Sequence, residues 1–130
     1  MSHWTHVKGK FNLMVKCKFG ESSPIYKIIA DAPKITGSEF PAIYNIHPSN
    51  QYPTKTEDGY YHEAEITVEG SLRDRELNET CNEIENFIRY LDTGCNEKTS
   101  ASGSIEVSAD KVECKGPYEV STTKTFYIYF

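Results

Sequence analysis

The fold is decided by residues 65–91, EITVEGSLRDRELNETCNEIENFIRYL, where the spacing of the apolar residues changes. From His62 to Leu72 the even positions are mostly apolar and the odd positions are polar, which is the pattern of a strand with one buried and one solvated face. Beyond Asp74 the apolar residues are four or three positions apart, as on one stripe of a helix: Leu77, Cys81, Ile84, Ile88 and Leu91. The chain therefore changes from strand to helix within SLRDR.

The ends of this helix can also be predicted. Asp74 or Ser71 can accept hydrogen bonds from the free amides of the first turn, and Glu76 suits the positive end of the helix dipole. Gly94 is expected to take the left-handed conformation that stops a helix. We place the helix at about residues 75–93.

Two arginines lie at the junction between strand and helix. Because free amides and the helix dipole favour negative charge there, Arg73 and Arg75 form a candidate anion site. The alternative is that they are solvated charges beside a helix cap, since no glycine-rich loop accompanies them.

Other stretches alternate in the same way as residues 62–72. An apparent turn at 115–118 predicts a hairpin between the last two of them. We expect an α+β fold, in which an antiparallel or mixed sheet of about four strands (near 4–19, 61–72, 103–114 and 120–130) carries the helix on one face. Ile84, Ile88 and Leu91 should then contact the apolar faces of the strands, namely Phe11, Leu13, Val15, Ile66, Val68, Ile105, Phe126 and Ile128.

Composition and charge limit the function. A chain of 130 residues is expected to form a single domain, and its net charge of −5 disfavours non-specific binding of nucleic acid. The lysines of the first strand share one face, and Glu63, Glu65 and Glu69 share the solvated face of a later strand. We expect these rows to pair across the sheet. The alternative is a lysine row that grips nucleic acid.

Expectations about cellular location and metal binding come from features that the sequence lacks. The opening MSHWTHVKGK lacks the apolar core of a signal peptide and no long apolar run occurs, so we expect a cytoplasmic protein without a membrane anchor. Cys17, Cys81, Cys95 and Cys114 have no metal-ligand spacing, so reduced thiols, no metal and no cofactor are expected, with Cys17 and Cys81 on buried faces.

No catalytic motif is present: the sequence has no nucleophile beside a base, Walker loop, dinucleotide fingerprint or HExxH helix. His6, His47 and His62 could still act as bases in a site assembled by the fold. A small enzyme therefore stays an alternative, and a protein without catalytic activity is the leading interpretation.

Residues 20–60 differ from the rest of the chain, since they contain five of the six prolines and four tyrosines. Only IYKIIA, from residue 25, is apolar enough for a helical turn or a short strand. A long connection of this kind is often functional, and tyrosine suits recognition; alternatively it covers one side of the sheet. The candidate binding residues of the chain are Tyr26, Tyr44, His47, Tyr52, Tyr60, Arg73, Arg75, Tyr127 and Tyr129.

The C-terminal strand, TKTFYIYF from residue 123, has aromatic residues on both faces. A helix on one side of the sheet can cover Phe126 and Ile128 but not Tyr127 and Tyr129 as well. A large exposed apolar patch usually marks an interface, so we expect a homodimer through the strand that carries Tyr127 and Tyr129.

Two short motifs, MSHWTHVKG at the start and TVEGSLRD before the helix, resemble those of a loose group of small phage and prophage proteins. The resemblance implies a host-cell setting and binding of a host factor, as in anti-defence or anti-CRISPR proteins. We therefore expect a non-catalytic protein that inhibits or sequesters a host protein. The alternative is a nucleotide or phosphorylated small molecule held near Arg73 and Arg75, with tyrosines stacked on its base.

Overall fold

The computed structural model describes residues 4–18, 20, 22–37, 40–50, 52–73, 76–94, 98–109 and 122–130. Six strands form one antiparallel sheet, which confirms the α+β class but corrects the expected number of four strands. In chain order the elements are β1 (Trp4–Cys17), α1 (Ile25–Asp31), β2 (Ile43–Pro48), β3 (Thr54–Thr56), β4 (Gly59–Arg73), α2 (Leu77–Arg89), the π-helical turn η1 (Tyr90–Gly94), β5 (Thr99–Ala109) and β6 (Thr122–Tyr129).

The sheet is centred on β1 and β4, which pair along their whole length from Trp4 opposite Arg73 to Cys17 opposite Tyr60. The strand order is β2, β4, β1, β5, β6, and β3 pairs with the start of β4. The fifth strand begins four residues earlier than expected, at Thr99, because Thr99 and Ala101 continue its alternation. The predicted turn at 115–118 lies outside the described residues.

The two additional strands come from residues 20–60, which therefore do not form one irregular connection. In IYKIIA the spacing of Ile25, Ile28 and Ile29 places all three on one buried side of α1. β2 was missed because it is short and ends at Pro48, and an edge strand tolerates a proline that a central strand would not.

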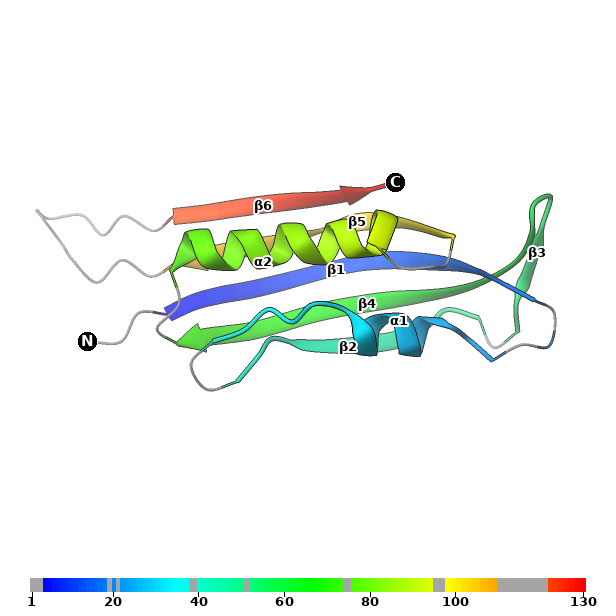
Figure 1. Cartoon of the computed structure of the whole chain (residues 1–130), viewed down its shortest axis with the longest axis horizontal. Coiled ribbons are helices and arrows are strands. Elements are labelled where there is room, and N and C mark those ends of the chain that lie inside the picture. The colour runs from blue at the N-terminus through cyan, green and yellow to red at the C-terminus, as the bar shows by residue number, and fades with distance from the viewer. Residues whose placement is uncertain are drawn as a thin grey trace, which may run out of the picture.

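Both helices lie on the same face of the sheet, which we call the covered face (Figure 1). α2 runs along the sheet, and α1 lies nearer to β2 (Figure 1). Together with inward side chains of the strands they enclose one hydrophobic core. We call the opposite face of the sheet, to which the remaining side chains of the strands point, the open face.

α2 is rotated relative to the expected stripe. The fully buried positions include Thr80, Ile84, Phe87 and Leu91, whereas Ile88 is only partly buried. The ring of Phe87 stacks on Tyr44, with centroids 5.0 Å apart, and meets the edge of Phe11 at 5.9 Å. Phe87 was missed because its partner Tyr44 belongs to β2, which the sequence pattern did not reveal.

The predicted helix ends are only partly correct. Glu76 is the N-cap residue but makes no side-chain cap bond, while Ser71 lies within β4 with its Oγ 3.0 Å from His6 Nδ1. Asp74 lies outside the described residues. Gly94 is not left-handed, as only Gly20, Gly59 and Gly103 have positive φ among the described glycines. Instead, the Thr99 hydroxyl donates to the carbonyl oxygen of Leu91 (2.5 Å), a contact that only the tertiary structure provides.

Candidate functional site

The open face of the sheet is one of two candidate binding surfaces. Inter-strand register places its side chains in rungs that cross five strands, from β2 at one edge to β6 at the other. The three central rungs are Ile43, Glu69, Lys8, Glu106 and Thr125; Asn45, Thr67, Lys10, Ser104 and Tyr127; and His47, Glu65, Asn12, Ser102 and Tyr129.

Charges on the open face are paired. Lys8 lies between Glu69 of β4 and Glu106 of β5, and Lys10 Nζ is 3.4 Å from Glu65 Oε2. The predicted pairing of the lysine and glutamate rows is therefore confirmed for Lys8 and Lys10, whereas Lys16 lies opposite Tyr61 and Glu63 opposite Met14. Since Lys8 and Lys10 have acidic neighbours, the centre of this face lacks the clustered positive charge that nucleic-acid binding needs.

Aromatic side chains stand at the β6 edge of the open face. Tyr127 and Tyr129 are 80% and 89% exposed, whereas Ile128 between them is buried in the core. β6 is the last strand on its side of the sheet. At the opposite edge, Ile43 is also exposed. Tyr127 shares its rung with Ser104 of β5 and Lys10 of β1, and Tyr129 shares its rung with Ser102 and Asn12.

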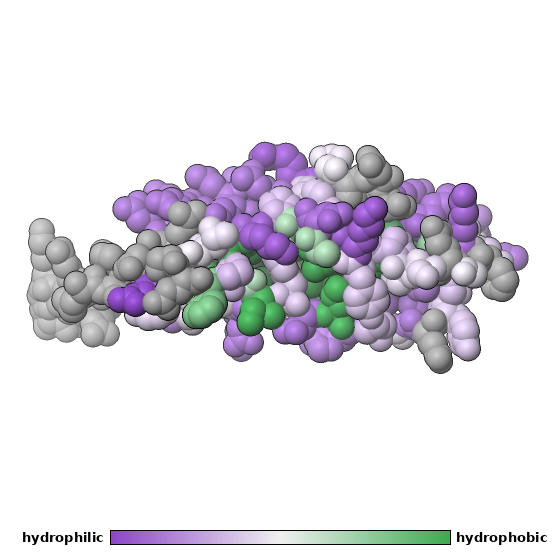
Figure 2. Space-filling view, turned by 60° about the horizontal axis from the view of Figure 1, so that its bottom comes forward, coloured by the Kyte–Doolittle hydropathy of each residue, from purple (hydrophilic) through white to green (hydrophobic). Residues whose placement is uncertain are grey.

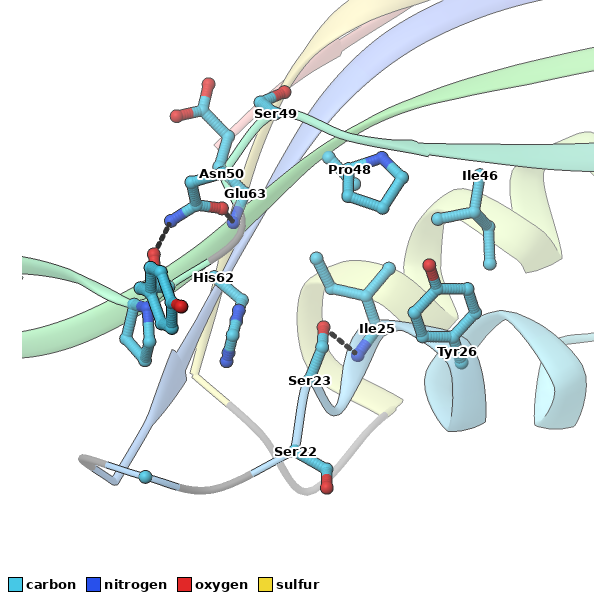
Figure 3. A pocket seen from close by; sticks show the side chains of 14 residues that line it. Ser22, Ser23, Ile25, Tyr26, Ile46, Pro48, Ser49, Asn50, His62 and Glu63 are labelled. Carbon is cyan, nitrogen blue, oxygen red and sulfur yellow. Dashed lines mark hydrogen bonds between the residues drawn. The ribbon is translucent and has the colours of Figure 1, made fainter.

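The second candidate is a pocket of about 600 Å³ on the helix side of the molecule, which we call the α1 pocket. It lies between the start of α1, the end of β2 and the start of β4, and its apolar lining includes Ile25, Ile46, Pro48 and Ala64. The imidazole ring of His62 and the ring of Tyr26 border the same space, and the Ile25 side chain lies between them in the view of Figure 3. His62 is 7% exposed, so it belongs to the wall of the pocket.

One wall of the α1 pocket is held by Asn50. Its Nδ2 donates to the carbonyl oxygen of Tyr52 at 2.7 Å and to Thr54 Oγ1 at 3.0 Å, and its Oδ1 accepts from the amide of Glu63 at 2.9 Å. These bonds tie the segment after β2 to β3 and β4. The wall is thus preformed, as is usual for ligand pockets.

The predicted site residues separate into several groups. Tyr26 and Tyr52 line the α1 pocket, while His47, Tyr127 and Tyr129 belong to the open face. On the open face, His47 of β2 and Tyr129 of β6 are the two ends of one rung, so four inter-strand spacings, or about 19 Å, separate them. Tyr60 is half-buried at the start of β4, opposite Cys17 and Lys55.

Tyr44 has a structural position. Its ring stacks on Phe87 in the core and its hydroxyl donates to the carbonyl oxygen of Pro33 at 3.2 Å. Burial raises the pKa of the Tyr44 phenol, and the negative charge of Glu83 raises that pKa further. The side chain is therefore held in its neutral form within the protein.

The structure does not bring Arg73 together with Tyr60 or with the tyrosines of the α1 pocket. Arg73 ends β4 opposite Trp4, whereas Tyr60 and the α1 pocket are at the other end of the sheet. Arg73 is thirteen positions after Tyr60 in the same extended strand, which corresponds to about 40 Å. One nucleotide cannot reach both, and Arg75 lies outside the described residues.

The three histidines in the described residues do not converge either. His6 and His62 are at opposite ends of the β1–β4 pair, opposite Ser71 and Val15, and His47 is on the other face from His62. Over the described part of the chain, no group of three histidine, cysteine or acidic side chains could hold a metal ion.

The two described cysteines, Cys17 and Cys81, are not joined in a disulfide. Cys81 is buried as expected, and burial raises the pKa of its thiol. Cys17 is only half-buried because it is the last residue of β1. Cys95 and Cys114 lie outside the described residues.

Sequence reasoning missed most of the α1 pocket. His62 was considered as a base, but its neighbours Ser23, Ile46 and Asn50 were not identified. The available signal was the concentration of proline, tyrosine and serine in residues 48–53. That signal marks a loop and does not tell which part of the sheet the loop approaches.

The surface on the α1 and β2 side is mostly hydrophilic, with a few hydrophobic residues near its centre (Figure 2). None of the helices in the described ranges combines the length and hydropathy needed to cross a lipid bilayer. Comparisons with protein-family models, curated proteins and solved structures found no match to this chain.

Proposed function

We propose that the protein is a non-catalytic binding protein that inhibits or sequesters a host protein, with the open face and β6 as its contact surface. One observation carries the proposal: within the described residues, both helices cover the same face of the sheet, and the other face ends at a strand with two highly exposed tyrosines. The resemblance of MSHWTHVKG and TVEGSLRD to small phage proteins supports a host protein as the partner.

The chemistry of the open face favours a protein partner. Its central rungs are rich in serine, threonine and asparagine, and the lysines of these rungs are matched by glutamates. Such a surface can make many hydrogen bonds without leaving an unpaired buried charge. Tyrosine is enriched among the residues that dominate binding energy, because it buries a large area with few rotatable bonds.

β6 adds a second means of binding. Lys124 is the one charged residue of this strand, and charged residues are what usually protect an exposed edge from pairing. An extended segment of the partner can therefore add to the sheet beside β6 through backbone hydrogen bonds.

The size of the surface limits the possible contact. Two tyrosines can bury about 300–500 Å² in total, whereas a stable interface needs about 800 Å² on each partner. The partner must therefore also cover the serine and lysine rungs next to β6. A host protein that contacts only the edge would bind weakly.

A photo-crosslinking amino acid placed at Tyr127 tests the proposal, with the same amino acid at Tyr26 as the matched control on the other side of the molecule. In bacterial lysate we expect one bacterial protein to be crosslinked in stoichiometric amount from position 127 and not from position 26. The double variant Tyr127→Lys and Tyr129→Lys should abolish co-purification of that protein.

Three outcomes would overturn the proposal. The first is that no bacterial protein is crosslinked, and the second is that crosslinking is equal from both positions. The third is that crosslinking occurs only to a second copy of this chain. The last outcome would assign the surface to self-association instead.

A further inference from the structure

We infer that the α1 pocket is a binding site for an uncharged, flat heteroaromatic ligand of nucleobase or nucleoside size. This site is independent of the proposed protein-binding surface, because the open face lies on the opposite side of the sheet. The inference rests on the volume of the pocket, the rings in its walls and the charge of its lining.

The volume and construction of the pocket suit a small ligand. About 600 Å³ lies within the usual range for small-molecule sites, and an apolar floor with a few polar groups is their usual composition. Ile25 and Ile28 anchor α1 in the core, and the Asn50 bonds hold the facing wall. A ligand would therefore meet a site that is already formed.

Several side chains with flat rings line the pocket. Its lining contains Tyr26, Tyr52, His62 and two prolines. Tyr26 is 53% exposed, so its ring can be covered by a stacked ligand without moving the core. Stacking on aromatic side chains is a sequence-tolerant way to hold a base, because every base has a π-face.

Polar groups at the rim suit the edges of a heteroaromatic ring. Ser22, Ser23 and Ser49 belong to the lining of the pocket, together with the buried side chain of His62. Ser23 Oγ accepts a bond of 3.4 Å from the amide of Ile25, which fixes it beside the floor (Figure 3). Hydroxyl groups can donate and accept, so they fit the mixed edge of a base.

Charge argues for an uncharged ligand. None of the described residues that line the pocket is lysine or arginine. Glu63 belongs to the lining, but in Figure 3 its carboxylate points away from Ile25 and Tyr26, and the side chain's register position is on the open face opposite Met14. The pocket therefore lacks the cationic groups that normally hold a phosphate.

Titration of the isotope-labelled full chain by NMR tests the inference, with adenosine as the probe and AMP and ribose as comparisons. Adenosine should cause saturable shifts at Ser23, Tyr26, Ser49 and His62. AMP should bind no more tightly than adenosine, and ribose should cause no saturable shift.

Variants separate stacking from other effects. Tyr26→Phe keeps the ring and should keep adenosine binding, whereas Tyr26→Ala should weaken it by about tenfold, the loss of one stacking contact. Tyr129→Ala, on the open face, is the matched control and should leave adenosine binding unchanged.

Four results would overturn the inference: no saturable shift with adenosine, shifts centred on β6, unchanged binding by the alanine variant at Tyr26, or AMP binding at least tenfold tighter than adenosine. None of these results bears on crosslinking from Tyr127, so the two proposals fail separately.

Discussion

The covered and open faces of the sheet are built from the same strands, but interactions of very different strength hold their side chains. In β1, Val7, Phe11 and Leu13 are at most 1% exposed, while Lys8 and Lys10, their neighbours in sequence, are exposed. The first set is held by packing, which makes each buried atom costly to remove. The second set is held by solvated pairs that contribute about 0–1 kcal/mol each. Adjacent residues of one strand therefore have very different tolerance to substitution.

Among the substitutions considered, Phe87→Ala on the covered face should cause the largest loss of stability. Phe87 is fully buried and lies against the rings of Tyr44 and Phe11, so its truncation leaves a cavity between α2, β2 and β1. We expect the free energy of unfolding to fall by about 3–5 kcal/mol, as measured by urea denaturation.

Two variants calibrate this measurement. Phe87→Leu keeps most of the volume and should cost clearly less than the alanine variant. Tyr129→Ala, on the open face, should change the free energy of unfolding by less than about 0.5 kcal/mol. Equal effects at positions 87 and 129 would contradict the distinction between the faces.

Gly103→Ala tests how closely β5 approaches β1. Gly103 has φ +156°, and a Cβ there would lie 2.5 Å from both Cα and Cβ of Phe11. Because backbone atoms cannot yield as a flexible side chain can, we expect a loss of about 2–3 kcal/mol in the free energy of unfolding. Gly20→Ala is the control: φ is +79° there, but nothing lies within 4 Å of the added Cβ. A loss at Gly103 no larger than at Gly20 would refute the close approach.

Glu83→Ala should have a smaller effect. The Glu83 carboxylate accepts from the amide of Thr36 at 2.7 Å and from its hydroxyl at 2.8 Å, and so ties α2 to the segment between α1 and β2. We expect a loss of about 1–3 kcal/mol in the free energy of unfolding. Glu83→Gln keeps an acceptor oxygen and should lose less; a larger loss in this variant would argue against these two bonds.

The smallest change in stability is expected for the double variant Tyr127→Lys and Tyr129→Lys, which acts on assembly instead. We predict that purified copies of the chain pair through β6 when the host protein that would occupy this edge is absent, so light scattering at micromolar concentration should give twice the mass of 14.8 kDa. The double variant should give the single mass. Its free energy of unfolding in urea should lie within about 0.5 kcal/mol of the original when both proteins are compared as monomers, below the concentration at which the dimer forms. A single mass for the unmodified protein would refute the dimer.

The sequence alone predicted the long elements well. β1, β4 and α2 were identified within a few residues because each is long enough for its period to be counted, and Lys8 and Lys10 paired with glutamates as expected. Tyr127 and Tyr129 were also correctly separated from Ile128, because alternation decides the face of a strand residue.

Short elements and contacts between distant segments were not predictable in this way. β2 has six residues and β3 has three, which is too few for a period to stand out, and the rotation of α2 depended on Tyr44 from β2. The helix end at Leu91 depended on a hydroxyl from β5 rather than on a glycine. Each of these features is set by a partner that lies far away in the chain.

In the long strands, local periodicity thus determined which residues are inside and which are outside, because side-chain direction follows from backbone geometry within one element. Which residues meet was decided by the tertiary structure. The packing of α1 against the sheet brought Tyr26 to the same pocket as His62 of β4, at the opposite end of that strand from Arg73. Such contacts depend on how the elements pack, and the spacing of apolar residues within a single segment does not predict them.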